Sequence, residues 1–215
     1  MIVLSESASN KIFHITHLDN LVGIIGQNNL LAQSQIQHHG MVYKNIAHAT
    51  IQDRRSISPV PCGPGGMLHD YVPFYFAPRS PMLYTISRGN VEGHEDGQQA
   101  VVHLVSSVQK VLDAGLDFVF TDGHGIMVLT EFFENLDDLD QVDWEIMNQR
   151  YWFDTGEDTD RKRRRQAEFL VHTQFPWNSI EEIAVMNEDV KIQVGRVLAG
   201  AAYKPNVVVR RAWYY

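Results

Sequence analysis

The sequence predicts an α+β fold that forms a single domain over residues 1–215. Short apolar runs of strand length recur along the chain, and amphipathic helical patterns fall between them. A chain of 215 residues has the length of one domain, and it contains no internal repeat or low-complexity linker that would divide it.

The first part of the chain predicts a strand followed by a short helix. Residues 1–11 resemble a loose leader, and residues 12–16 alternate in a β-prone pattern typical of a strand. Apolar positions 21, 22, 24 and 25 then indicate a helix that Thr16 or Asp19 could cap. Residues 30–32 are expected to be extended, and residues 33–49 predict a loop because they lack periodicity.

Proline and glycine dominate the next segment. Residues 58–84 contain six prolines and three glycines, which exclude a long helix. Before this segment, residues 51–55 could form one helical turn. Within it, residues 71–76 predict a strand with an aromatic face, and Pro81 suits the first turn of a helix.

Strands and helices alternate again in the second half of the chain. The predicted strands are 100–105, 118–121, 168–171, 180–185 and 206–210, and the predicted helices are 108–114 and 190–199. The stretch 124–160 is mixed. Its aspartates at 137, 138, 140 and 143 indicate a solvated helix face that buries Leu136, Leu139, Val142 and Trp144.

Composition excludes several classes of protein. With 44% apolar and 20% charged residues, the chain is neither disordered, collagen-like nor a disulfide-stapled miniprotein. It contains neither a signal peptide nor an apolar run long enough to cross a membrane, and its single cysteine, Cys62, fits a reducing compartment. We therefore expect a cytoplasmic protein without membrane contact. Because the net charge is −8, any nucleic-acid contact needs a local basic patch.

Two charged groups are candidates for catalysis. Glu168 begins an apolar strand in QAEFLV, where a rigid element could hold it as a general base. Arg54 or Arg55 could fork two phosphate or carboxylate oxygens. The structural alternatives are a strand-edge glutamate paired with an arginine, and a surface salt bridge.

The segment around His14 is a candidate ligand site. His14 and Thr16 face the same side of the predicted strand, and Gly23 in the following helix would permit a close approach. The alternative is a core histidine beside a hydrogen-bonded threonine. Ten histidines invite a metal interpretation, but no metal-binding spacing occurs, so we expect no metal site.

The run from Arg161 to Arg165 is the strongest basic block. Aromatic residues flank it, and cations with aromatic rings suit single-stranded nucleic acid. The alternative is a solvated charge run balanced by nearby acidic residues. The phosphate contacts predicted here are Arg161, Lys162, Arg163, Arg164 and Arg165, and Arg79, Arg88 and Arg150 are the other arginines that could replace them.

Together, six motifs resemble the DarT family, whose members are toxin enzymes that ADP-ribosylate thymidine in single-stranded DNA. The motifs are FHITHLDNLVGI, IQDRRS, GGMLHDYVPFYFAPRSPMLY, FVFTDGHG, RQAEFLV and the closing WYY. They occur in the family's order from about His14 to Tyr215. The resemblance implies an ADP-ribosyltransferase-like split β-sheet core that grips NAD, with surrounding helices and long loops.

The resemblance also assigns residues to roles. Glu168 becomes the catalytic glutamate and Arg55, rather than Arg54, the catalytic arginine. Residues from about 37 to 56 would cover NAD, and those from about 124 to 168 would recognise the substrate. A tyrosine that contacts NAD could be Tyr71, Tyr75 or Tyr84. The implied NAD-binding residues are His14, Ile15, Thr16, Gly23, Leu31 and Arg55.

The expected reaction is transfer of ADP-ribose from NAD to ring N3 of thymidine, with release of nicotinamide. Glu168 would remove the N3 proton, and Arg55 would position NAD. The resemblance further implies the antitoxin DarG as partner, whose macrodomain removes the modification. Open alternatives are an RNA or protein acceptor, a metal-dependent nuclease using Glu168 with Asp122 or Asp70, and a single-strand-binding module without catalysis.

Overall fold

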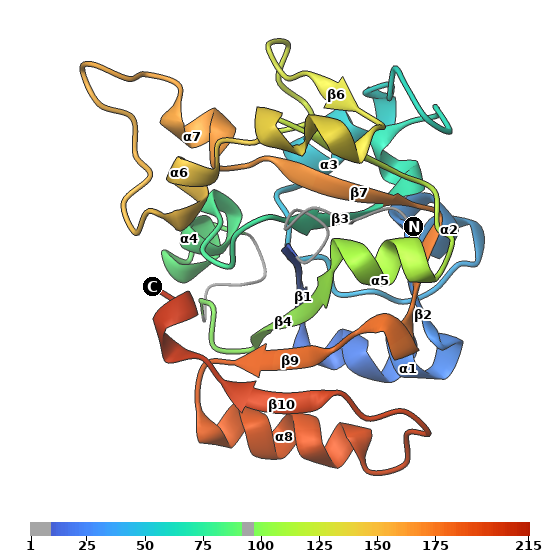
Figure 1. The fold of residues 1–215 in the computed structure, drawn as a ribbon. Coiled ribbons are helices and arrows are strands. Elements are labelled where there is room, and N and C mark those ends of the chain that lie inside the picture. The colour runs from blue at the N-terminus through green and yellow to red at the C-terminus, as the bar shows by residue number, and fades with distance from the viewer. Residues whose placement is uncertain (1–9, 92–96) are drawn as a thin grey trace.

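The computed structural model describes residues 10–91 and 97–215, which share one large mixed sheet (Figure 1). The sheet has the strand order β10-β9-β4-β1-β3-β7-β5-β6, and β2 pairs with β8 in a small separate sheet. Only β9 and β10 run parallel. The strands are β1 (Lys11–His17), β2 (Asn29–Leu31), β3 (Tyr71–Tyr75), β4 (Val101–Ser107), β5 (Phe118–Thr121), β6 (Phe132–Phe133), β7 (Glu168–His172), β8 (Gln174–Pro176), β9 (Glu182–Val185) and β10 (Asn206–Val209).

Eight short helices surround this sheet in the described ranges. In Figure 1, α8 covers the β10 end at the bottom, and α6 and α7 lie beyond β7 at the upper left. The helices are α1 (Leu21–Gln27), α2 (Gln33–His38), α3 (Ala49–Ile57), α4 (Pro81–Ser87), α5 (Val108–Asp113), α6 (Trp144–Asn148), α7 (Arg161–Arg164) and α8 (Glu188–Leu198).

The central strands are buried on both faces. β4 pairs with β1 through seven residues, from Lys11 opposite Ser107 to His17 opposite Val101. On one side the core contains aromatic side chains such as Phe74, Phe169 and Trp152, which are almost completely removed from water. Burial on both faces fits continuous apolar runs rather than strict alternation, and it makes the sheet a rigid support for side chains at its strand ends.

The structure confirms most predicted strands and helices and differs from the prediction in four regions. Residues 33–38 form α2 rather than a loop, because this polar helix buries only Ile36 and has too little apolar periodicity to be recognised. α3 extends over Ala49–Ile57, beyond the expected single turn. Strands β6 and β8 were not expected, since two or three residues give no periodic signal.

Two local predictions also need correction. Neither Thr16 nor Asp19 caps the first helix: the His17 side chain accepts a hydrogen bond from Asp19 N at the start of a 3-10 turn over Leu18–Asn20. The acidic stretch is a 3-10 helix over Leu136–Gln141 rather than an α-helix, although Leu139 is buried as expected. Of the predicted leader over residues 1–11, residues 1–9 lie outside the described residues, and Lys11 belongs to β1 rather than to a leader.

Candidate active site

Strands β1, β3 and β7 and helices α3 and α4 enclose a cavity of about 300 Å³. Sites of roughly 300–1,000 Å³ are typical for small ligands. Its walls bring together residues far apart in the chain, including His14 from β1, Arg55 from α3 and Glu168 from β7. Their neighbours are mainly apolar, so charged groups here are shielded from water.

The cavity wall holds a buried ion pair between Arg55 and Glu168. Arg55 Nη1 donates to both carboxylate oxygens of Glu168 at 2.9 Å. Glu168 is 1% exposed and Arg55 is 7% exposed. The pair is therefore neither a strand-edge contact nor a surface salt bridge, and the adjacent Arg54 is exposed, donating instead to Ile126 O at 3.0 Å.

Each residue of this ion pair is held in place by the strand or helix to which it belongs. Glu168 is the first residue of β7, and its backbone N–H donates to the buried Thr121 Oγ1 at 2.9 Å. Arg55 lies in the last turn of α3. Its Nη2 atom is buried without a hydrogen-bond partner within the described residues. Since buried guanidinium groups are normally fully hydrogen-bonded, this nitrogen is available to a ligand in the cavity.

His14 offers a second free polar atom. Its Nδ1 lies 2.8 Å from Pro73 O, and because a carbonyl oxygen only accepts, Nδ1 carries the hydrogen. Burial lowers the pKa of His14 to about 4, so the ring is neutral near pH 7. Its Nε2 is buried with no partner in the described part of the chain and can accept a hydrogen bond from a ligand.

The other residues expected to contact NAD divide into two groups. Ile15 and Leu31 line the cavity. Thr16 and Gly23 are not among its lining residues: Thr16 Oγ1 accepts from Asn20 Nδ2 at 3.0 Å, and Gly23 is exposed on α1. A Cβ added at Gly23 would meet no atom within 4 Å, so its packing does not require glycine.

Of the three candidate tyrosines, Tyr75 lies nearest to the ion pair. Tyr75 pairs directly with Glu168 across β3 and β7 and lines the cavity. Burial, and secondarily the charge of Glu168, raise the pKa of Tyr75, so it stays protonated. Tyr71 also lines the cavity, but its hydroxyl donates to Gly65 O at 2.7 Å. Tyr84 packs edge-on against Trp152 outside the cavity.

Three cavity residues had no assigned role in the sequence analysis. His124 and His69 line the cavity, and burial lowers the pKa of both rings. Tyr43 belongs to the segment expected to cover NAD; burial raises the pKa of its hydroxyl, and the nearby Thr16 side chain partly offsets this. His124 lies within FVFTDGHG and His69 within GGMLHDY, so the motifs contained both residues, but no local pattern distinguished them from core histidines.

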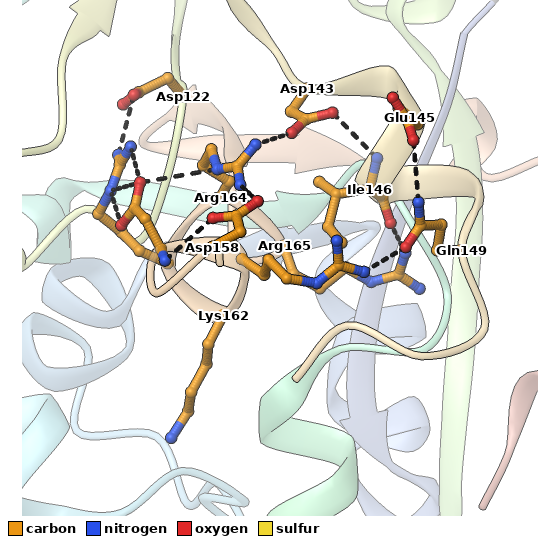
Figure 2. Close-up of polar contacts among 12 residues, drawn as sticks. Asp122, Asp143, Glu145, Ile146, Gln149, Asp158, Lys162, Arg164 and Arg165 are labelled. Atoms are coloured by element: carbon orange, nitrogen blue, oxygen red, sulfur yellow. Dashed lines mark hydrogen bonds and ion pairs between the residues drawn. The ribbon is translucent and has the colours of Figure 1, made fainter. Parts of the chain in front are cut away.

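Intramolecular contacts occupy most of the basic run (Figure 2). Arg163 contacts Asp122 and Asp160, each at 2.8 Å, and Arg164 contacts Asp143 and Asp158.

The other three residues of the run differ from one another. Arg165 is 3% exposed and donates to backbone carbonyls, including Met147 O at 2.7 Å. Arg161 donates to Tyr151 O at 3.0 Å. Lys162 is exposed, lines the cavity, and extends away from the acidic groups in Figure 2.

Residues 10–91 and 97–215 contain no group of three or more histidine, cysteine, aspartate or glutamate side chains that could hold a metal ion. Over the same ranges, every helix is too short or too polar to cross a membrane.

Comparison with known proteins relates nearly the whole chain to one family. A family model described as "ssDNA thymidine ADP-ribosyltransferase, DarT" matches residues 13–215. A DNA ADP-ribosyl transferase from Thermus sp. strain 2.9 is 50% identical over 206 residues, which cover 95% of each chain.

Two solved structures of Thermus sp. 2.9 DarT are similar to the fold. The complex with ADP-ribosylated single-stranded DNA has a TM-score of 0.90 and 48% identity, covering 96% of this chain and 97% of that chain. The complex with NAD+ has a TM-score of 0.84 and 45% identity, covering 96% and 98%. A more distant relative from Thermosipho africanus, 24% identical over 84% of this chain and 43% of its own length, is a fusion of DNA ADP-ribosyl transferase with DNA ADP-ribosyl glycohydrolase.

Proposed function

The chain belongs to the DarT family of single-stranded DNA thymidine ADP-ribosyltransferases, and we propose that it transfers ADP-ribose from NAD to ring N3 of an unpaired thymidine, releasing nicotinamide. Membership of this family supports the general activity, which is that of a DNA ADP-ribosyltransferase that uses NAD. The observation that carries the residue-level proposal is the buried Arg55–Glu168 pair in the cavity wall.

The cavity fits NAD by its unused polar atoms. Arg55 Nη2 is a buried donor and His14 Nε2 a buried acceptor, and neither has a partner within the described chain. A dinucleotide carries phosphate and carbonyl acceptors as well as hydroxyl and amide donors, so it can satisfy both. Ile15 and Leu31 supply apolar wall, and Tyr75 supplies an aromatic ring.

Thr16 and Gly23 remain predicted NAD-binding residues, but unlike Ile15 and Leu31 they do not line the cavity. Thr16 would act on the cavity indirectly, because its side chain lies near Tyr43, which lines the cavity. Gly23 leaves the outer surface of α1 open to approach, since a side chain there would project into free space.

Glu168 is positioned to act as the general base. Its carboxylate accepts the N3 proton of thymine, and the N3 electron pair forms the new bond to the ribose carbon. NAD supplies the ADP-ribosyl group, and the electrons of the broken bond leave with nicotinamide. Arg55 orients the carboxylate, because its Nη1 donates to both carboxylate oxygens.

An unpaired base is required because duplex pairing hides thymine N3. Lys162 is the residue of the basic run best placed to contact the phosphates of the substrate, because it alone among the five lines the cavity. Arg161, Arg163, Arg164 and Arg165 remain predicted DNA contacts, but aspartates and backbone carbonyls occupy their donors in the described chain.

The partner expected for this activity is the antitoxin DarG. One relative joins the transferase to a DNA ADP-ribosyl glycohydrolase in a single chain, which links addition and removal of the modification. We infer that the chain acts as the toxin of such a pair.

Parallel acceptor assays test the proposed function. Labelled NAD is offered with a single-stranded oligonucleotide containing thymidine, the same strand with N3-methylthymidine, the duplex, RNA and protein. Label should enter only the first. Equal labelling of the N3-methylated strand would contradict N3 as the acceptor, and labelling of RNA or protein alone would replace the substrate.

A further inference from the structure

A second groove, of about 780 Å³, lies beside the C-terminal segment and is lined by four arginines. They come from four parts of the chain: the turn after β3, the end of α6, the end of α7 and the last 3-10 turn. The groove residues suited to ligand binding are these four arginines and two aromatic residues: Arg79, Arg150, Arg165, Arg211, Trp213 and Tyr215.

These arginines differ from their neighbours in having no acidic partner. Within the described residues, none of the four forms an ion pair with a carboxylate side chain, whereas Arg163 and Arg164 on the adjacent helix contact aspartates. Among residues 10–91 and 97–215, no acidic side chain lines the groove. In a protein of net charge −8, this is a concentrated positive surface.

Arg79 shows that part of this charge is available to a ligand. The Arg79 guanidinium lies 4.1 Å from the centroid of the Tyr215 ring, and its buried Nε has no hydrogen-bond partner in the described chain. Arg165 contributes charge to the groove wall, but its side chain is buried and donates to the backbone carbonyls of Arg79 and Met147. Arg150 and Arg211 are exposed at the rim.

The groove and the active-site cavity share two walls. In the turn after β3, Arg79 faces the groove while Pro81 and Met82 line the cavity. At α7, Arg165 faces the groove while Lys162 lines the cavity. A polymer seated in the cavity therefore reaches the groove by crossing one of these short segments.

We propose that this arginine groove binds the phosphates of the substrate single strand beside the thymidine held in the cavity. Guanidinium groups fork phosphate oxygens bidentately, and Arg79 and Tyr215 offer flat faces against which a flanking base can stack. The inference rests on the proposed function, because it assigns the path of the DNA that the enzyme modifies.

The test compares oligonucleotide lengths in the Arg150→Ala/Arg211→Ala variant. Both side chains are exposed, and neither lines the catalytic cavity. The matched control is Arg196→Ala/Lys204→Ala, which removes the same charge outside the cavity and the groove. Affinity is measured against salt for a short strand, limited to the thymidine and its immediate neighbours, and for strands extended at the 5′ or 3′ end.

The variant should bind one extended strand more weakly and bind the short strand normally. The slope of log affinity against log salt should fall by about 0.7 for each lost phosphate contact, thus by about 1.4. The control should match the unmodified protein. Unchanged slopes, equal weakening of short and extended strands, or loss of antitoxin inhibition with normal DNA binding would each overturn the groove assignment. Transfer of ADP-ribose to DNA by the protein without substitutions tests the proposed function separately.

Discussion

Replacing Arg55 should destabilise the protein strongly, because it leaves a buried carboxylate without a partner. Arg55→Met keeps the length of the side chain and removes its charge. Both groups of the pair are less than a tenth exposed, and both carboxylate oxygens of Glu168 accept from one guanidinium nitrogen. Breaking a buried pair on one side costs about 3–5 kcal/mol, compared with about 0–1 kcal/mol for an exposed pair.

Urea unfolding measures this difference as a lower midpoint at unchanged m-value. By heat, a cost of about 3–5 kcal/mol corresponds to a decrease in Tm of roughly 6–20 °C for a domain of this size. Arg54→Met is the matched control, since its side chain is exposed, and it should cost below about 1 kcal/mol.

Adding Glu168→Gln to Arg55→Met should recover part of the loss, because no uncompensated charge then remains. If Arg55→Met cost no more than Arg54→Met, the pair would not be the buried element described here.

Three further predictions follow from the cavity. Lys162→Ala should lower the slope of log DNA affinity against log salt by about 0.7, because Lys162 lines the cavity. Arg164→Ala removes an arginine held by aspartates and should change this slope less. Equal slopes for the two variants would contradict the assignment of Lys162. Burial lowers the pKa of both His14 and His103 to about 4. Between about pH 6.5 and pH 4, these two histidines are therefore protonated in the unfolded chain but neutral in the folded chain. The free energy of unfolding should therefore be largest above pH 6.5 and decrease across that window, and a flat profile by urea titration at each pH would argue against buried neutral rings. Tyr75→Phe should leave NAD affinity within about threefold in calorimetry, because the hydroxyl already donates to Met82 Sδ at 3.6 Å. Tyr75→Ala should lower the affinity at least about tenfold, because it removes an aromatic ring from the cavity wall.

The central sheet was predictable because its strands contain β-branched and aromatic runs. β4, β5 and β10 appear in the sequence almost at their observed bounds, and the apolar spacing of α8 places it within two residues. α2 could not be found in this way, because one buried residue, Ile36, gives no period. β6 and β8 consist of too few residues to show alternation.

The motifs, but no local physical pattern, led us to expect Arg55 and Glu168 in one candidate site. Arg55 and Glu168 are separated by 113 positions, and no local pattern indicates that their side chains meet. Choosing Tyr75 over Tyr71 and Tyr84 required the β3–β7 register, which places it opposite Glu168. For the basic run, the sequence left two interpretations open: cations that contact nucleic acid, or a charge run balanced by nearby acidic residues. The fold favours the second for Arg163 and Arg164, which contact the nearby Asp160 and Asp158 as well as the more distant Asp122 and Asp143.

The pH dependence of DNA modification by Glu168→Gln tests the central claim most directly. If this carboxylate removes the N3 proton, the variant should lose about 10²–10⁴-fold in rate near neutral pH while still binding NAD. Its rate should then rise about tenfold per pH unit as thymine deprotonates by itself, whereas the unmodified enzyme should change little over the same range. A variant whose rate stays parallel to that of the unmodified enzyme at every pH would contradict a general base at position 168.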